Sequence, residues 1–351
     1  MIPILYDSSE IYFASNGLGR LRETISCTVS EERNGLFECD FEYPVTGQNY
    51  DRIALGKVIG AKHDDSDDVQ PFDIVSHSKP INGVVKYHAV HINYRQSKLV
   101  VSGTNINSLS AALAMLGNAT PSNPFTYETD KVSTGHLAAA DGVPRSVKSI
   151  LGGVEGSILD AYGGEYKYNK FIVSLMTSRG SDQGFSIRYG VNLLDYTDDT
   201  NYIDSYNSCV PYWAGGDTIV KGGRVDSGLS SYNGRTECIP LDLTSKFESQ
   251  PTAAQLEAAA LSYMQNNQVN LPTQNIKVNF IRLQDTEEYA EYAPLLDCKL
   301  CDTVRVVFPQ YGMDGKFKIV KTVYNTLTER YDEMELGALS ITLSQALGLS
   351  K

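Results

Sequence analysis

The stretch Leu295–Leu339, LLDCKLCDTVRVVFPQYGMDGKFKIVKTVYNTLTERYDEMELGAL, carries the strongest fold signal in this chain. It starts with a β-rich run, Thr303–Phe308, whose side chains alternate between two faces, one of which carries Val304, Val306 and Phe308. We expect a turn at Gly312–Gly315, then a second strand-like run, Lys316–Tyr324, and a polar closing segment, Glu329–Glu333. This pattern predicts a β-hairpin that belongs to a barrel or a sandwich.

A second alternating pattern lies near the N-terminus. In residues 24–30 the hydroxyl side chains fall on one face, and the other face carries Ile25, Cys27 and Val29. Asn34 and Gly35 follow, and both residue types tolerate the positive φ of a tight turn. Beyond them the inward positions are Phe37, Cys39, Phe41 and Tyr43. The two runs predict an antiparallel ribbon, with more strands around residues 52–61, 70–76 and 84–94.

Residues 105–117 change to a helical period. Apolar residues recur at i, i+4 and i+7, with a cap at Asn107 or Ser108 and a stop at Gly117; they are Leu109, Leu113 and Leu116. We expect this helix to open an α+β domain that contains a strand at residues 170–176. Strands then resume at residues 183–194.

A second helix is expected at residues 252–266. Thr252 and Gln255 have the spacing of a capping box, and the apolar face is expected to consist of Leu256, Ala260, Tyr263 and Met264. Residues 211–229, with the only tryptophan, Trp213, indicate a glycine-punctuated loop or hairpin before this helix. A strand at residues 275–283 is expected after it.

The length of 351 residues exceeds what one core usually organises. We therefore expect a mainly β protein with α+β insertions, made of two β-barrel-like domains and smaller α/β domains. The expected bounds are 1–100 for the first β-barrel-like domain, 101–185 for the α+β insert and 186–351 for the second. The last of these includes a helix-containing subdomain around residues 245–272.

The composition narrows the class of partner. Acidic residues exceed basic ones by 42 − 30 = 12, and tight nucleic-acid binding needs a basic surface that neutralises phosphates. We therefore expect DNA only in passage. The start does not resemble a signal peptide, and no window reaches the roughly 18 apolar residues of a membrane span, so we expect no membrane insertion. The six scattered cysteines indicate reduced thiols in a protein made in the cytosol.

Cys298 and Cys301 have the spacing of a CxxC motif. A redox role requires a helix N-terminus that lowers the pKa of one thiol, and a zinc site requires a second cysteine or histidine pair. The segment enters a strand and lacks such a pair. We interpret the two residues as structural thiols.

An acidic run follows His63. Within it, Asp64, Ser66 and Asp68 imitate the first, third and fifth positions of a calcium loop, but valines occupy the positions that need glycine and glutamate. Residues 64–68 are therefore interpreted as a solvated acidic loop, with weak cation binding as the minor alternative.

Other candidate motifs are also incomplete. His88 and His91 are three apart in an expected strand, so their side chains should point to opposite faces and share no metal. Residues 215–223 superficially resemble a phosphate loop but lack its Gly-Lys-Ser/Thr order, and they are interpreted as a turn. Glu287 and Glu288 are expected to be solvated. We therefore expect no enzyme activity and nominate no catalytic, cofactor-binding or metal-binding residue.

Several of these blocks resemble the phage tail hub family, the tail-associated proteins at the tip of long-tailed bacteriophages. In that family a C-D-T-V-R-V type strand, a return strand and an E-L-G ending recur together. Three further blocks follow the pattern in order, so that the resemblance spans nearly the whole chain. They are Val29–Gly35 with Phe37–Glu38 and Phe41–Val45; Gly152–Asp160 with Gly163–Glu165, Ser186–Gly190, Asn192 and Leu193; and Thr252–Asn266 with Leu271 and Pro272.

The resemblance implies a prophage tail protein similar to the hub region of tail-associated lysins and to the baseplate hub ring of contractile tails. Three copies would close into a homotrimer whose six barrels face the hexameric distal tail ring. The central channel would pass the tape measure protein and then DNA, and tail fibre or receptor-binding proteins would be further partners. Its location would be the virion tail tip, assembled in the host bacterial cytoplasm.

Many family members carry a long C-terminal extension that degrades peptidoglycan or binds the host. This sequence ends about a dozen residues after Gly337, so we expect no such activity. One alternative is a glycan-binding or host-receptor-binding module, which would gather exposed tyrosine and tryptophan in one cleft. A cell-wall hydrolase is a further alternative, but the sequence lacks its catalytic residues.

Overall fold

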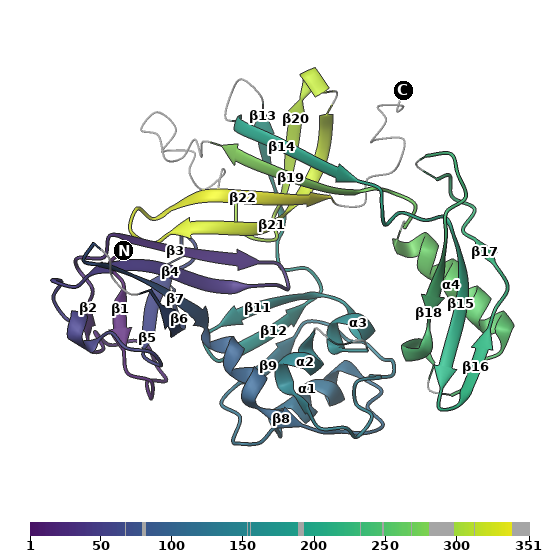
Figure 1. Ribbon diagram of the computed structural model, residues 1–351, viewed down its shortest axis with the longest axis horizontal. Coiled ribbons are helices and arrows are strands. Elements are labelled where there is room, and N and C mark those ends of the chain that lie inside the picture. Colours follow the sequence, from purple (N-terminus) through teal and green to yellow (C-terminus); the bar gives the residue numbers. More distant parts are fainter. Residues whose placement is uncertain are drawn as a thin grey trace.

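The structure, a computed structural model, describes residues 1–66, 68–78, 82–152, 154, 156–188, 193–231, 233–247, 249–267, 269–280, 298–311 and 313–338. Strands from the N-terminal and the C-terminal parts of the chain join in one 13-stranded sheet (Figure 1). Strands outweigh helices in the described residues, which confirms the expected mainly β class. Glu287 and Glu288 lie outside them.

The N-terminal part of the large sheet consists of seven strands. They are β1 (Ile4–Tyr6), β2 (Gly19–Arg20), β3 (Ser26–Glu32), β4 (Phe37–Pro44), β5 (Val58–Lys62), β6 (Val69–His77) and β7 (Val84–His91). The spatial order is β3-β4-β7-β6-β5-β1-β2, and each neighbouring pair is antiparallel. The 3-10 helix η1 (Tyr50–Arg52) lies between β4 and β5, and η2 (Ile92–Lys98) follows β7.

The predicted ribbon is the pair β3 and β4. Asn34 adopts a φ of 59° in the connecting turn, and the four inward residues of β4 are buried as predicted. The prediction was wrong for Ile25, which is 52% exposed. The chain turns at Thr24, whose backbone N–H donates to Leu21 O, and β3 begins only at Ser26.

The C-terminal part of the sheet contains six strands. They are β13 (Asp182–Arg188), β14 (Leu193–Asn201), β19 (Thr273–Phe280), β20 (Thr303–Phe308), β21 (Met313–Asn325) and β22 (Arg330–Ala338), with η6 (Pro309–Tyr311) between β20 and β21. The order β14-β19-β22-β21 continues directly into β3. Strand β20 pairs with the start of β21, and β13 lies parallel to β20.

The predicted strand at residues 303–308 is confirmed as β20, with its apolar face buried. The predicted turn was misplaced. Met313 pairs with Phe308, so Gly315 lies inside β21, and the polar segment at residues 329–333 begins another strand, β22. The hairpin is therefore tighter than predicted.

Between the two parts of the sheet lies an α/β segment, residues 100–176. It contains the short strands β8 (Val100–Val101) and β10 (Arg145–Ser146), the sheet strands β9 (Thr126–Thr129), β11 (Glu165–Asn169) and β12 (Ile172–Met176), and the helices α1 (Leu109–Gly117), α2 (Val147–Leu151) and α3 (Ile158–Tyr162). The first helix begins behind Ser108, whose Oγ accepts from Ala111 N at 3.3 Å. Its three leucines are buried, as predicted.

Residues 202–270 form a separate unit, which we call the distal lobe. It consists of β15 (Ser208–Gly215), β16 (Thr218–Lys221), β17 (Val225–Asp226), β18 (Cys238–Asp242), η3 (Thr244–Lys246) and α4 (Ala253–Asn267). Figure 1 shows it standing apart from the other sheets beyond β14 and β19. None of the described helices, α4 included, is long and apolar enough to cross a membrane.

Helix α4 begins with the predicted capping box. Gln255 N donates to Thr252 Oγ1 at 3.3 Å, and Thr252 N donates to Gln255 Oε1 at 2.8 Å. Leu256, Ala260 and Met264 are buried against the lobe sheet. Tyr263 was wrongly placed in this apolar face: it is 37% exposed, because it is one position away from the row that meets the sheet.

The described residues contain no closed β-barrel, so the two expected barrel-like domains appear as one continuous sheet. The sheet is continuous because β21, with 13 residues, pairs with β20 at its start and with β3 at its end. The N-terminal part nevertheless curls. Thr326, just beyond β21, donates from its backbone N–H to Cys27 O and from Oγ1 to Lys62 O, and so links β3 to the end of β5.

Candidate functional site

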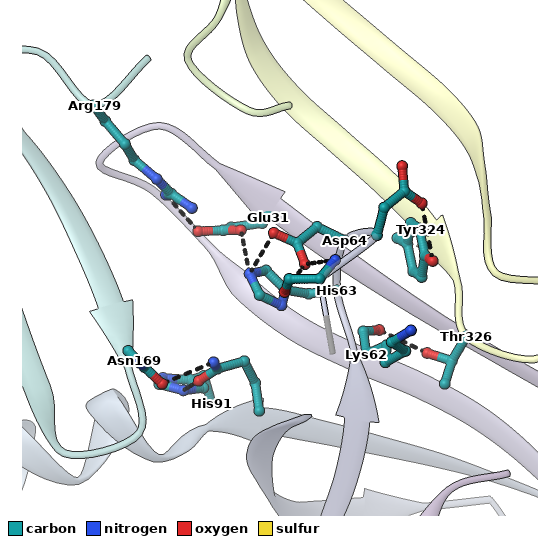
Figure 2. A network of polar contacts seen from close by, with 12 residues as sticks. Glu31, Lys62, His63, Asp64, His91, Asn169, Arg179, Tyr324 and Thr326 are labelled. Atoms are coloured by element: carbon teal, nitrogen blue, oxygen red, sulfur yellow. Dashed lines mark hydrogen bonds and ion pairs between the residues drawn. The ribbon is translucent and has the colours of Figure 1, made fainter. Parts of the chain in front are cut away.

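A buried polar junction lies where the large sheet meets the α/β segment. We define the junction by Glu31, His63, Asp64, Glu165, Arg179 and Lys318. Figure 2 shows Glu31 of β3, His63 and Asp64 at the end of β5, and Arg179 of the link between β12 and β13 pointing toward one another. The junction brings the buried ion pairs Glu31–Arg179 and Glu165–Lys318 close together.

Arg179 connects two parts of the junction. Its Nη1 lies 2.6 Å from Glu31 Oε1, and the two side chains are only 10% and 3% exposed. Burial lowers the pKa of Arg179, but the charge and hydrogen bond of Glu31, together with smaller contributions from other acidic neighbours, raise that pKa above its usual value. The backbone N–H of Arg179 donates to Glu165 Oε2 at 2.7 Å. One residue therefore joins β3 to β11.

Glu165 is contacted from a third direction by Lys318 of β21. Lys318 Nζ lies 2.5 Å from Glu165 Oε1 and 3.1 Å from Ser178 Oγ, and Arg33 Nη1 lies 3.6 Å from the same carboxylate. Burial raises the pKa of Glu165, but the hydrogen bonds from Lys318 and from the Arg179 backbone bring that pKa below its usual value. The buried carboxylate is thus held ionised.

The link between β12 and β13 also packs directly on the segment before β20. Ser181 N donates to Asp302 Oδ1 at 2.8 Å, and Lys299 N donates to Asp302 Oδ2 at 2.8 Å. A Cβ placed on Gly180 would lie 2.0 Å from Cys301 O. Glycine is therefore required for this approach of two backbones.

His63 and Asp64 enter the junction from the end of β5. His63 Nε2 lies 3.8 Å from Glu31 Oε2 and 3.7 Å from Asp64 Oδ2. Burial raises the pKa of Asp64, but His63 and hydrogen bonds from Ser66 bring it below its usual value. The predicted solvated loop is therefore wrong for its first residue, because Asp64 turns inward next to a buried histidine.

A cavity of about 280 Å³ borders the junction. Its charged lining includes three acidic and three basic side chains: Glu31, Asp64, Asp302, Lys167, Arg179 and Lys299. The balance of signs gives no net preference for an anion or a cation. Within the described ranges, no group of three or more His, Cys, Asp or Glu side chains is arranged to hold a metal ion.

Neutral side chains extend the contact along the edge of β11. Asn34 Nδ2 donates to Gly164 O at 2.9 Å, and its Oδ1 accepts from Tyr166 N at 2.8 Å. The amide therefore pairs with strand-edge backbone groups as another strand would. Nearby, Gln70 Nε2 donates to Asn169 Oδ1 at 3.1 Å.

The two strand histidines point to opposite faces, as predicted. His91 is buried, its Nε2 lies 3.3 Å from Gln70 Oε1, and its Nδ1 accepts from Asn93 N. Burial lowers the pKa of His91 well below its usual value. His88 lies on the outer face, with Nδ1 2.8 Å from Asp40 Oδ1.

The remaining sequence motifs lie away from the junction or serve its packing. Cys298 and Cys301 are buried and form no disulfide, and burial raises the pKa of Cys301 to about 12. Residues 215–223 were predicted as a turn, but only residues 216–217 connect β15 to β16; strand β16 occupies Thr218–Lys221. Trp213 is partly buried and packs against the core of the distal lobe.

Sequence reasoning did not identify the junction as a site. Asn34 and Glu165 lay in blocks of the family resemblance but were given no contact role, and Arg179 carried no motif. Lys318 was expected only as part of a strand. The partners Arg179 and Glu31 are 148 positions apart. No local period or spacing signals a contact of that kind.

No family model matches the sequence, and no curated protein matches it. Solved structures do match. The prophage tail protein gp18 of Listeria monocytogenes EGD-e aligns with a TM-score of 0.61 at 14% identity, over 99% of this chain and 98% of that chain. The chain has the fold of prophage tail proteins.

Two further structures share this tail-protein fold. The tail protein from Neisseria meningitidis MC58 has a TM-score of 0.62 at 10% identity, over 98% of each chain. The 43 kDa tail protein of prophage MuSo2 from Shewanella oneidensis has a TM-score of 0.62 at 11% identity, over 96% of this chain and 98% of that chain. The resemblance inferred from sequence motifs is thus matched by the fold.

Proposed function

We propose that this chain is a structural protein of a bacteriophage or prophage tail and that it serves as the hub of the tail tip. The observation that carries this proposal is the end-to-end similarity in fold to three tail proteins, two of them from prophages. A structural match to one part of the chain alone would be compatible with an unrelated role for the whole protein. An end-to-end match at about one tenth sequence identity instead points to a shared architecture.

The junction supports a mechanical role for the protein. Buried ion pairs link β3, β11 and β21, which lie in three different parts of the chain. Such pairs are costly to desolvate and strongly destabilising to break. They therefore hold the three parts in one fixed arrangement. A structural component needs such rigidity to keep its contacts with neighbouring proteins in register.

We further propose the domain bounds 1–100, 101–185 and 186–351, with barrel-like units at both ends. In the C-terminal part, the order β13-β20-β21-β22-β19-β14 begins and ends with strands that are consecutive in sequence. Pairing of β13 with β14 would close a sheet of that order into a ring. The curl that brings β5 towards β3 is the corresponding feature of the N-terminal part.

In this proposal three copies form a homotrimer around a channel, joined to the distal tail ring and passed by the tape measure protein and DNA. Closed rotational symmetry lets one surface of a subunit meet a different surface of the next. The net charge of −12 suits a channel through which DNA moves without binding. Tail fibre or receptor-binding proteins would attach at the outside, and the protein would have no enzymatic activity.

Immunogold labelling of purified virions tests the location. Antibodies against this chain should label the tail tip, and labelling confined to heads or tail shafts would contradict the proposal. A zymogram with purified protein and bacterial cell walls tests the alternative. Cell-wall cleavage that is lost on a single substitution would favour a hydrolase.

A further inference from the structure

Four asparagines of this chain are each followed by a glycine, and all four lie in connections between strands. They are Asn16, Asn34, Asn82 and Asn233. Asparagine before glycine is a reactive pair, because glycine has no side chain to hinder its backbone nitrogen. The sequence therefore gives the four sites a similar reactivity, and the fold decides how far each of them can react.

The reaction is loss of the side-chain amide without an enzyme. The backbone nitrogen of glycine attacks Cγ of asparagine, its proton passes to a base in the solvent, and the bond from Cγ to Nδ2 breaks as ammonia leaves. Water then opens the cyclic imide at either carbonyl, which yields aspartate or isoaspartate. One water is consumed and one ammonia is released, so the reaction needs a free glycine nitrogen and a side-chain amide that can turn towards it.

Hydrogen bonding of the glycine nitrogen separates the four sites. At three of them the glycine N–H already donates a hydrogen bond. The pairs are Gly17 N to Ser15 Oγ at 3.1 Å, Gly35 N to Glu32 O at 3.1 Å and Gly234 N to Ser231 O at 3.4 Å. Gly83 N has no such partner in the described part of the chain. It is therefore the least restrained nucleophile of the four.

The side chain of Asn82 is placed for the same reaction. Its Oδ1 accepts from Val84 N at 3.2 Å, so the side chain folds back along the Gly83 peptide. A hydrogen bond to Oδ1 also stabilises the negative charge that develops on this oxygen during the attack. The leaving group, Nδ2, has no partner among the described residues, and the side chain is exposed to solvent.

Asn34 is exposed as well, but both atoms of its amide are held at the edge of β11. Nδ2 donates to Gly164 O at 2.9 Å, and Oδ1 accepts from Tyr166 N at 2.8 Å. Attack at Asn34 requires these two contacts and the hydrogen bond of Gly35 N to break first. The contact along the edge of β11 thus protects this asparagine.

We propose that Asn82 is a site of spontaneous deamidation in the folded protein and that Asn34 is protected from it. The change adds one negative charge, so the net charge becomes −12 − 1 = −13. Aspartate can still accept from Val84 N. Isoaspartate adds a methylene group to the backbone before Gly83, whose carbonyl accepts from Val45 N at 2.9 Å, and should loosen that contact. The inference does not depend on the proposed function.

Peptide mapping by mass spectrometry tests the proposal on the full-length protein, incubated in mildly alkaline buffer either folded or in urea. In the folded protein Asn82 should convert at least about tenfold faster than Asn34, because Asn34 must first lose its hydrogen bonds. In urea the two rates should converge. An Asn82 that keeps its amide as long as Asn34 does, or a rate ratio that is the same in both states, would overturn the proposal.

Ser15→Ala tests the role of the glycine nitrogen, because it removes the acceptor of Gly17 N. Asn16 should then convert about three to ten times faster, as expected for the loss of one hydrogen bond. Asn82 in the same molecule is the control, and its rate should not change. An unchanged rate at Asn16, with a native circular dichroism spectrum, would contradict the role given to these hydrogen bonds.

Discussion

Arg179 shows at the scale of single residues how this molecule holds its parts together. Its guanidinium and the Glu31 carboxylate are both buried, so each neutralises a charge that water cannot reach. Removing one partner of such a pair leaves the other charge uncompensated. The pair therefore fixes geometry more than it adds net stability.

Arg179→Met should lower the free energy of unfolding by about 3–5 kcal/mol, because Glu31 is left buried and unpaired. Denaturant unfolding followed by circular dichroism measures the loss. Arg305→Met is the control: its pair with Asp314 is about half exposed, and its loss should cost under about 1 kcal/mol. Equal losses for the two variants would contradict the role given to the junction.

Gly180→Ala should destabilise the protein by about 1–3 kcal/mol, because the new methyl group would overlap the Cys301 carbonyl. Gly117→Ala is the matched control, since no atom lies within 4 Å of its added Cβ and it ends helix α1. Thermal unfolding of both variants provides the measurement. A Gly180 variant as stable as the control would show that the two backbones are not held at this distance.

The lowered pKa of Glu165 leads to a prediction of how the free energy of unfolding changes with pH. Its folded-state pKa is lowered from an unfolded value of about 4.3. Its contribution is therefore complete above that value and is lost as pH falls through the folded pKa. Unfolding free energies measured between neutral pH and about pH 3 should fall, and the fall should be smaller for Glu165→Gln. An identical pH dependence in the two proteins would refute this assignment.

At the scale of elements, local signals explain what the sequence revealed. A strong hydrophobic period marks four features: the ribbon β3–β4, the strand β20 and the helices α1 and α4. A turn at residue 34 limits the ribbon, and caps at residues 108 and 252 begin the two helices. The errors in the predicted elements lie where a hydrophobic period begins or ends. Ile25 precedes its strand, Gly315 continues one, and Tyr263 borders the buried row of its helix.

The capping box of α4 gives a prediction at this scale. Thr252→Ala removes the hydroxyl that accepts from Gln255 N and should destabilise the distal lobe by about 1 kcal/mol. Hydrogen exchange of the α4 amides measures the effect locally. Exchange in β3 and β4 is the internal control and should not change, because the lobe has its own core. Faster exchange throughout the molecule would mean that the lobe does not unfold separately.

At the scale of the whole molecule, the sequence predicted the order of the elements along the chain better than it predicted how the strands join into sheets. Motif order along the chain predicted a tail hub, and the fold matches that of phage tail proteins from end to end. The continuous sheet was not foreseen, because pairing of β21 with β3 joins residues about 300 positions apart. Contacts at such separation depend on three-dimensional packing that no local pattern encodes.

The central claim is that this chain is a structural component of a tail tip. Cryo-electron microscopy of intact virions or induced prophage tails tests it most directly. The account predicts density for three copies of this fold around a channel at the tail tip, against the distal tail ring. A reconstruction in which the tail-tip density is fully explained by other proteins, with this chain absent from the particle, would contradict it.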